Sequence, residues 1–418
     1  YGLDRANFLQ LLACYSLPFG AYFFLLARRK ARPKFQHLIY AAIGFRLLFL
    51  FATPSLSDDY FRFLWDGQLF ANGYNPFDFK PAESDGTFPQ QNILLEGMNS
   101  PQYYSIYPPI AQYLHGFAAW LFPNSLLGGI TVIRLLILLA EFGTLWLLPK
   151  VLQQFFMNRE KALIYALNPL VIVELSGNLH LEAIMIFFLL LGIRFLQKDD
   201  TVLGGFSWAL AAATKLIPLI FLPVFFRLWK WPKPFWFYVF GGFVFLLLWF
   251  PFQSFGFWEH FNSSVNLYFS TFEFNAGLYY LIREVWQSVV GYNPIETLGP
   301  ILSNTALVGI LLILWWKKWP NLKAIFTPFL MALFLYYSLA LIVHPWYVCT
   351  LVFLSLFTKY TFPVVWSALV VLSYAAYQTE SYQENYYLIA FEYILLFAWF
   401  GVELVRHHIK KLPLISLR

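Results

Sequence analysis

The sequence predicts an all-α membrane protein, a polytopic helix bundle of about 11 to 13 transmembrane helices. Of its 418 residues, 60% are hydrophobic and 12% are charged, against roughly 25% charged in an ordinary soluble domain. Apolar runs recur from Asn7 to Val405 with polar breaks every ~15 to 25 residues, which suits helices that cross about 30 Å of hydrocarbon. Stretches such as FVFLLLWF have no polar face, whereas the strands of a membrane barrel would alternate.

The positions of the basic residues predict the topology. The net charge is +6, but 21 of the 28 Lys and Arg residues lie in breaks that a single topology places on the cytoplasmic side. This placement excludes a nucleic-acid-binding role as the reason for the charge. The breaks are 28–34, 150–161, 194–198, 227–233, 317–323, 359 and 406–418.

This topology has thirteen crossings, with the N-terminus outside and the C-terminus inside. The expected spans are 7–27, 38–54, 127–149, 162–175, 183–197, 202–214, 216–226, 235–251, 301–316, 325–343, 346–357, 362–377 and 386–405.

Two features of this topology follow from the charge count. The apolar segment 107–122 must lie at the outer interface without crossing, and 202–226 must be two short helices broken around Lys215 and Pro218. Irregular backbone at membrane depth is tolerated where protein or a water-filled cavity satisfies it. We therefore expect one domain, 1–418, with juxtamembrane helices in the outer loop 55–126 and a second outer loop at 252–300.

The acidic pair Asp58 and Asp59 directly follows the second predicted span, in SDDYFRFLWDGQLFANGYNPF. A carboxylate at the membrane surface beside aromatic side chains is partly desolvated, which raises its pKa and makes it a better proton acceptor. If 59–71 is helical, Arg62 lies on the same face and could orient one carboxylate or bind an anion. In the structural alternative, Ser57, Asp58 or Asp59 caps the helix and Arg62 is the ion-pair partner.

A second polar group lies in NPLVIVELSGNLHLEA. This stretch places Asn178, His180 and Glu182 at an outer turn, with Glu174 one helical turn before it. Ionisable groups this close to hydrocarbon are costly and usually face a cavity. His180 is therefore a candidate general base, ligand or substrate partner, and a satisfied structural histidine is the alternative.

Cations outside the cytoplasmic set are candidates for binding a phosphate near the outer headgroup plane. Lys215 in AATKLIPL and Arg283 in NAGLYYLIRE fit this role best. Lys215 could instead snorkel to the interface; if it binds phosphate, Lys215→Met should weaken donor use at unchanged thermal stability. Arg46 and Arg134, inside predicted spans, are further candidates, although Arg134 could pair with Glu141 on its own helix.

The remaining motifs bear on cofactors. His115, His180, His260 and His344 lie on the outer side, His344 in the turn HPWY, but no two have a metal-ligand spacing such as HxxxH. The sequence also has no glycine-rich phosphate loop, nucleotide motif or serine-histidine elbow. We therefore expect no metal and no cofactor. A substrate must then bring its own leaving group and arrive from the membrane or the outer space, and a lipid-phosphate donor meets both demands.

Several stretches together resemble a known family. DDYFRFLWDGQLFANGYNPF, followed in order by YPPIAQ, NPLVIVELSGNLHLEA, ATKLIPLIFLP, FNAGLYYLIR and HPWY, resembles the bacterial polyprenyl-phosphate-mannose-dependent mannosyltransferases of the GT-C superfamily of membrane glycosyltransferases. The resemblance covers Ser57 to Tyr347, and the first motif is its most specific part. It implies a polyprenyl-phosphate sugar as donor and inverting transfer, with an acidic residue of the first outer loop as catalytic base.

The resemblance also implies residue roles. Asp58 is the first acid of the loop motif and is preferred as the base, with Asp59 as the other candidate. The candidate substrate-binding residues are Arg62, Asp66, Tyr107, Asn178, His180, Glu182, Lys215, Arg283 and His344.

The expected function is transfer of a hexose, with mannose preferred, from the polyprenyl-phosphate donor to a lipid or glycan acceptor. The expected location is the bacterial inner membrane, with the site on the periplasmic side, and the expected partners are these substrates and membrane lipids, without nucleic acid. Two other classes remain. A lipid-linked glycan polymerase or ligase would use a diphosphate lipid as donor, and a lipid-linked sugar flippase would be expected to show repeated halves, which this sequence lacks.

Overall fold

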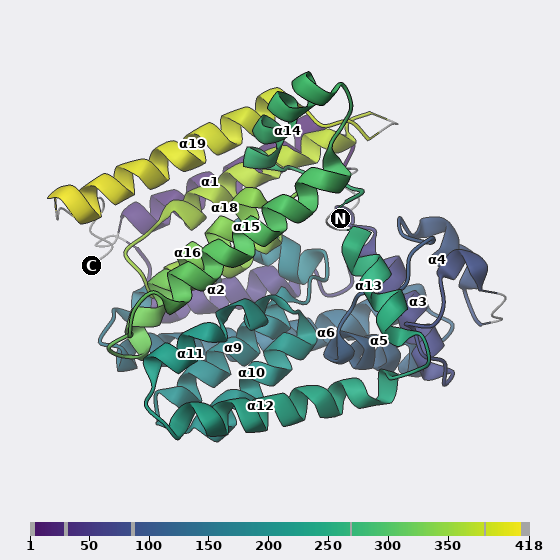
Figure 1. The fold of residues 1–418 in the computed structure, drawn as a ribbon, viewed down its shortest axis with the longest axis horizontal. Coiled ribbons are helices and arrows are strands. Elements are labelled where there is room, and N and C mark those ends of the chain that lie inside the picture. The colour runs from purple at the N-terminus through teal and green to yellow at the C-terminus, as the bar shows by residue number, and fades with distance from the viewer. Residues whose placement is uncertain (1–4, 29–31, 85–87, 268–269, 380–381, 411–418) are drawn as a thin grey trace. The chain divides into compact units, whose positions relative to one another are not determined.

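The computed structural model describes residues 5–28, 32–84, 88–267, 270–379 and 382–410. Within these ranges every named element is a helix, and the only β-type pairing is a bridge between Phe274 and Ile342 (Figure 1). The predicted all-α class is confirmed.

In the described part of the chain, six helices are long and apolar enough to cross a membrane, and there are seven if one bent pair counts as a span. This makes the chain an integral membrane protein. The six are Phe8–Ala27, Leu126–Gln154, Lys233–Phe252, Ile295–Trp315, Leu322–Leu339 and Tyr386–His407.

The expectation of thirteen crossings also counts shorter segments. Thr201–Thr214, Ile217–Leu228 and Phe362–Tyr377 are apolar helices of 10–17 residues, below the ~20 residues that usually cross a bilayer. The span expected at 346–357 contains only the nine-residue helix α17 (Tyr347–Ser355). The polytopic bundle is confirmed, whereas the number thirteen stays a prediction.

Two predicted helix breaks are present. Helix α10 (Thr201–Thr214) ends at Lys215, whose backbone is extended, and helical structure resumes at Ile217. The bent pair Pro169–Gly177 and Glu182–Leu196 turns by 112° at the predicted outer turn. The segment predicted to lie at the interface forms α5 (Pro109–Leu121), 13 residues long, which at 1.5 Å per residue spans about 20 Å and is too short to cross.

The chain divides into two compact units. Unit 1 contains Ile43–Leu147 and Ile172–Leu267, and unit 2 contains the described residues of Leu3–Ala42, Leu148–Val171 and Tyr268–Arg418. The chain passes between the units several times, within helices α2 (Phe35–Leu47) and α6 (Leu126–Gln154) among other places. The expectation of one domain stays a prediction.

Unit 1 is built from helices that approach closely at glycines. Helix α10 packs against α9 and α12, which lie beside it in Figure 1; a Cβ at Gly205 would lie 2.3 Å from the carbonyl oxygen of Phe237. Helices α3 and α5 also pack together, and a Cβ at Gly67 would lie 2.3 Å from the carbonyl oxygen of His115. Small residues allow such contact between helix backbones. The helices are α3 (Asp59–Ala71), α4 (Gln91–Gly97), α5, the π-helical turn η3 (Ile172–Gly177), α9 (Glu182–Leu196), α10, η4 (Ile217–Phe221), α11 (Pro223–Leu228), α12 (Lys233–Trp249) and α13 (Phe257–Leu267).

An aromatic cluster joins two loops of unit 1. Phe77, in the segment after α3, packs against four rings from the end of α12 and from α13, with ring centroids 5.2 to 6.0 Å apart. The four are Trp249, Phe252, Phe257 and Phe261. This aromatic cluster joins the segment after α3 to the segment from the end of α12 into α13.

Unit 2 is a series of helices that pack on their neighbours in sequence, α15 on α16, α16 on α17, α17 on α18 and α18 on α19. Glu403 of α19 accepts hydrogen bonds from the backbone N–H groups of Thr361 (2.8 Å) and Phe362 (3.1 Å). A carboxylate at this position satisfies the first N–H groups of α18. The helices are α1 (Phe8–Ala27), α7 (Ala162–Ala166), α8 (Pro169–Val171), α14 (Gly277–Val290), α15 (Ile295–Trp315), α16 (Phe326–Leu339), α17, α18 (Phe362–Leu369) and α19 (Tyr386–Leu404).

Candidate active site

Two segments of unit 1 that are distant in sequence meet beside the acidic pair. Asp58 is the N-cap position of α3 and Asp59 is its first residue, so the condition that 59–71 is helical is met. The N–H of Leu56 donates to Asn178 Oδ1 at 3.4 Å, which joins this segment to the polar outer turn. Ser57 Oγ accepts from the N–H of Asp59 at 3.3 Å, whereas the Asp58 side chain makes no capping hydrogen bond. The capping alternative therefore applies to Ser57 and not to the Asp58 carboxylate.

Glu174 organises the polar turn that follows η3. Its Oε2 accepts a hydrogen bond from Asn178 Nδ2 at 3.1 Å and lies 3.6 Å from His180 Nε2. All three side chains are buried. Between them, Leu179 has a backbone φ of +65°, a left-handed conformation that costs about 1–2 kcal/mol for a residue with a side chain. The surrounding contacts must hold this turn in place.

Lys215 and Glu182 form an ion pair across two helix ends. Lys215 Nζ contacts Glu182 Oε1; the glutamate side chain is fully buried and the lysine side chain is 22% exposed. Snorkelling to the interface does not account for this contact. The pairing also changes the expectation for Lys215→Met, because removing the cationic partner of a buried carboxylate is strongly destabilising. We now expect that substitution alone to lower thermal stability.

Burial and neighbouring charges shift the pKa of the Asp59 carboxyl. Desolvation by burial raises the pKa of this half-buried carboxyl from 3.8 to about 6, and the charges of Asp58 and Glu182 add to the rise. The charge of Lys215 and a side-chain hydrogen bond from Asn99 act in the opposite direction. Asp59, Lys215 and Glu182 therefore form one interacting group, and Asp59 is a carboxylate whose proton affinity suits proton transfer near neutral pH.

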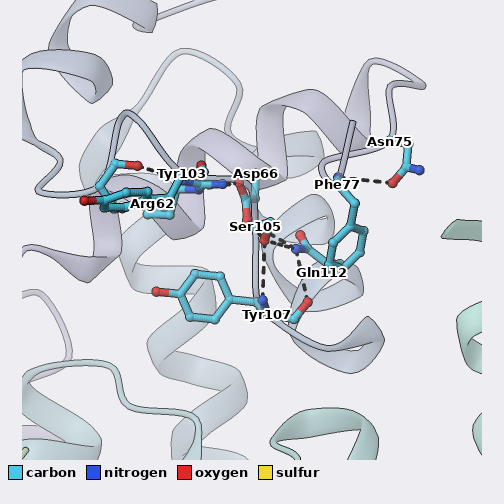
Figure 2. A network of polar contacts seen from close by, with 9 residues as sticks. Arg62, Asp66, Asn75, Phe77, Tyr103, Ser105, Tyr107 and Gln112 are labelled. Carbon is cyan, nitrogen blue, oxygen red and sulfur yellow. Dashed lines mark hydrogen bonds and ion pairs between the residues drawn. The ribbon is translucent and has the colours of Figure 1, made fainter. Parts of the chain in front are cut away.

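Arg62 and Asp66 form a buried ion pair along α3, with 2.7 Å between Arg62 Nε and Asp66 Oδ1 (Figure 2). Arg62 Nη1 also donates to the carbonyl oxygens of Ser100 (3.1 Å) and Tyr103 (2.8 Å). Arg62 is 2% exposed. These contacts hold the segment before α5 onto α3, and a substrate-binding role of Arg62 stays a prediction.

The same network extends from Asp66 to the YPP motif. Asp66 accepts from Ser105 Oγ and from Gln112 Nε2 at 3.2 Å, and Ser105 Oγ accepts from the N–H of Tyr107 at 3.4 Å (Figure 2). Asp66 is fully buried and Tyr107 is partly exposed. Substrate roles of Asp66 and Tyr107 also stay predictions. Sequence reasoning missed Ser105 and Gln112, because an uncharged polar side chain gives no signal of its burial or of its partners.

Arg46 and Arg134 are both fully buried within unit 1. Arg46 Nε pairs with Glu141 Oε2 at 2.6 Å, so the partner of Glu141 comes from α2, another helix. The Arg134 guanidinium donates to backbone carbonyl oxygens of Ser176, Gly177 and Leu50. Both guanidinium groups thus bind other groups of the protein, and a phosphate-binding role of either residue stays a prediction.

Arg283 and His344 belong to unit 2. Arg283 is 7% exposed and forms ion pairs with Glu273 and Glu284, while its Nη2 also contacts the hydroxyl of Tyr386 at 3.3 Å. This guanidinium is embedded in a network of its own unit, and its predicted contact with a substrate phosphate stays a prediction.

His344 lies in a cluster of aromatic rings. Its ring stacks on Trp346 with 4.3 Å between centroids and lies 4.8 Å from the ring of Phe274. Phe274 forms the β-bridge with Ile342, so the motifs FNAGLYYLIR and HPWY are joined through their backbones. Sequence order alone could not reveal this pairing.

In the part of the chain that the structure describes, no group of three or more His, Cys, Asp or Glu side chains is placed to hold a metal ion. The polar side chains that act on Asp59 are two carboxylates, an amide and an ammonium, from Asp58, Glu182, Asn99 and Lys215. Such a set can accept a proton and can contact an anion.

Comparison with known proteins defines the family. A family described as "Alpha-(1->6)-mannopyranosyltransferase, N-terminal domain" matches residues 7–231, more than half of the chain. The chain belongs to the alpha-(1->6)-mannopyranosyltransferase family. The matched region contains the acidic pair, the polar turn and Lys215, and the predicted resemblance to mannosyltransferases is confirmed at the level of the family.

Individual members of the alpha-(1->6)-mannopyranosyltransferase family resemble the chain over shorter stretches. Alpha-(1->6)-mannopyranosyltransferase A of Mycobacterium tuberculosis is 27% identical over 186 residues, which cover 44% of this chain and 34% of that protein. The A and B enzymes of Corynebacterium glutamicum are 24% and 25% identical, over 42% and 40% of this chain and 35% and 29% of their own lengths. The chain thus spans about a third of the length of the curated relatives it matches.

Proposed function

We propose that this protein is a glycosyltransferase that moves mannose from a polyprenyl-phosphate donor to a glycan acceptor. The observation that carries the proposal is Asp59, a carboxyl with a pKa of about 6 that interacts with the charge of Lys215 at a break in the membrane helices. A proton acceptor and a cation are the two groups that this transfer needs. Membership of the alpha-(1->6)-mannopyranosyltransferase family supports mannose as the sugar.

In the proposed reaction, a carboxylate of the acidic pair accepts the proton of an acceptor hydroxyl as that oxygen attacks the anomeric carbon. The bond from the anomeric carbon to the phosphate oxygen breaks, and its electron pair leaves with the polyprenyl phosphate. Lys215 neutralises the departing phosphate. An ammonium has three donors, so its contact with Glu182 is compatible with a second contact to phosphate. Because the leaving group is a stable anion, no second carboxylic acid is required, unlike in glycoside hydrolysis.

Two arguments bear on which carboxylate is the base. The order of the loop motif favours Asp58. The raised pKa of Asp59 favours Asp59, because a general base works best when its pKa lies near the operating pH. The proposal assigns the role to the pair, and substitution of each residue in turn decides between them.

The stereochemistry and the location follow from the same proposal. Inverting transfer that yields an alpha linkage, as in the names of the relatives, requires a donor in which mannose is beta-linked to phosphate. The charge distribution supports an active site on the periplasmic side of the bacterial inner membrane, since most Lys and Arg residues mark the opposite side.

The test uses the purified full chain in lipid nanodiscs with radiolabelled polyprenyl-phosphate mannose and an alpha-(1->6)-linked oligomannoside acceptor. We expect mannosylated acceptor, and a loss of at least a hundredfold in rate in either Asp58→Asn or Asp59→Asn, whichever removes the base. Polyprenyl-diphosphate mannose and polyprenyl-phosphate glucose serve as matched donors. Transfer from the diphosphate alone, or near-normal turnover in both variants, would overturn the proposal.

A further inference from the structure

A buried guanidinium contacts two segments that lead to the candidate active site. Arg134, on α6, is fully buried, and three of its nitrogens donate to backbone carbonyl oxygens: Nε to Ser176 (2.8 Å), Nη2 to Gly177 (2.9 Å) and Nη1 to Leu50 (3.2 Å). Ser176 and Gly177 are the last residues of η3, where the chain leaves the helix and bends. The last carbonyl groups at the C-terminal end of a helix lack intrahelical partners and form the negative end of the helix dipole, so a cation there is favourable.

The two segments that Arg134 contacts are the ones that carry the site. Gly177 directly precedes Asn178, and the chain continues through the left-handed Leu179 to His180 and Glu182. Leu50 lies in the turn after α2, on the approach to the acidic pair. The hydrogen bond from Leu56 to Asn178 also joins these two segments. We therefore expect loss of the Arg134 contacts to loosen the junction between the segments.

We infer that Arg134 is a positioning residue, which fixes the spacing between the acidic pair and the Glu182–Lys215 pair by clamping both segments through their backbones. This inference rests on the proposed function for its catalytic consequence, but the clamp itself is a property of the fold. Three donors in a fixed planar fork are needed to reach three carbonyls at once, and a lysine cannot reproduce that geometry. Arg134 acts on the reaction only through the residues that it holds.

Arg134→Lys is the direct test, because it retains the charge and most of the side-chain volume. Hydrogen exchange should become at least tenfold faster for the backbone amides of 178–182, while exchange in α10 and α12 stays as in the natural protein. Arg46→Lys is the matched control: Arg46 is an equally buried arginine of unit 1, but it pairs with Glu141. It should leave exchange at 178–182 unchanged.

Activity gives the second readout. In Arg134→Lys we expect kcat to fall at least tenfold and the acidic limb of the pH profile of kcat/KM to shift, because the charges around Asp59 are displaced. Arg46→Lys should leave the position of that limb unchanged. Natural exchange at 178–182 in Arg134→Lys, or the same changes in both variants, would overturn the inference. If the natural protein transfers no mannose, the proposed function fails, whereas the exchange experiment still tests the clamp.

Discussion

Substituting Lys215 and Glu182 separately and together distinguishes binding of a donor phosphate from support of the fold. Removing one partner of a buried ion pair costs about 3–5 kcal/mol, because the other charge stays buried and uncompensated. The Lys215 side chain is 22% exposed and that of Glu182 is fully buried, so we expect Lys215→Met to cost about 3 kcal/mol, at the lower end. Replacing both partners, as Lys215→Met with Glu182→Gln, removes both charges of the pair and should restore most of the lost stability.

Catalysis should respond differently. A charge-assisted hydrogen bond to phosphate contributes about 1.5–3 kcal/mol, which corresponds to roughly 10- to 150-fold in kcat/KM for the donor. The double variant lacks the ammonium, so its donor use should stay reduced by this factor although its stability has recovered. Glu182→Gln alone retains the ammonium, and it should lose less activity than either variant that lacks Lys215.

The assay combines thermal unfolding in detergent with steady-state kinetics at varied donor concentration, for the natural protein, both single variants and the double variant. A double variant that regains both stability and donor use would refute the phosphate-binding role, and would leave Lys215 as a structural partner of Glu182. A double variant that stays as unstable as Lys215→Met would instead refute the argument from buried charge.

Four further predictions concern activity and stability as functions of pH, packing, and topology. If Asp59 is the base, the acidic limb of the pH profile of kcat/KM should lie near pH 6. Asp58→Asn should move this limb to lower pH, because the Asp58 charge raises the pKa of Asp59. An unmoved limb in an active Asp58→Asn variant would contradict this. Since the pKa of Asp59 is higher in the folded chain than its ordinary 3.8, its contribution to stability should decrease as pH rises from 3.8 to about 6, measurable by denaturant unfolding. Gly67→Ala should destabilise unit 1 by about 1–3 kcal/mol, because the added Cβ meets a backbone carbonyl of α5. Gly44→Ala is the control: a Cβ added at Gly44 would meet no other part of the protein within 4 Å, so thermal stability should stay equal or rise. A cysteine at Ser125 should react with an impermeant thiol reagent from outside or be shielded by lipid, and labelling only from the cytoplasm would show that α5 crosses the membrane.

The sequence predicted those parts of the fold that depend on a single segment. Hydropathy gave the helical class, and the distribution of basic residues correctly predicted the break at Lys215, because a lysine and a proline at membrane depth disfavour a continuous span. Segment 59–71 is helical, which is the condition under which Arg62 was expected on the same face as the acidic pair. These features depend on composition over at most ~20 residues.

The contacts between segments could not be predicted. The partner of Lys215 lies 33 residues earlier, and Glu141 pairs with Arg46 from another helix and 95 residues away, although the spacing suggested Arg134. Nothing in the sequence indicated that Arg134 would bind carbonyl oxygens, because backbone groups have no sequence signature. The contacts of Arg62 with the carbonyl oxygens of Ser100 and Tyr103 were likewise not predicted, since charged residues are mostly exposed.

The aromatic cluster around Phe77 has a mechanical consequence. Its ring contacts those of Trp249, Phe252, Phe257 and Phe261. We therefore expect the segment after α3 and the segment from the end of α12 into α13 to move together. Separate movement of either segment would break these ring contacts, and we expect a chimera that exchanges only one of them with a relative to mismatch the rings of the other.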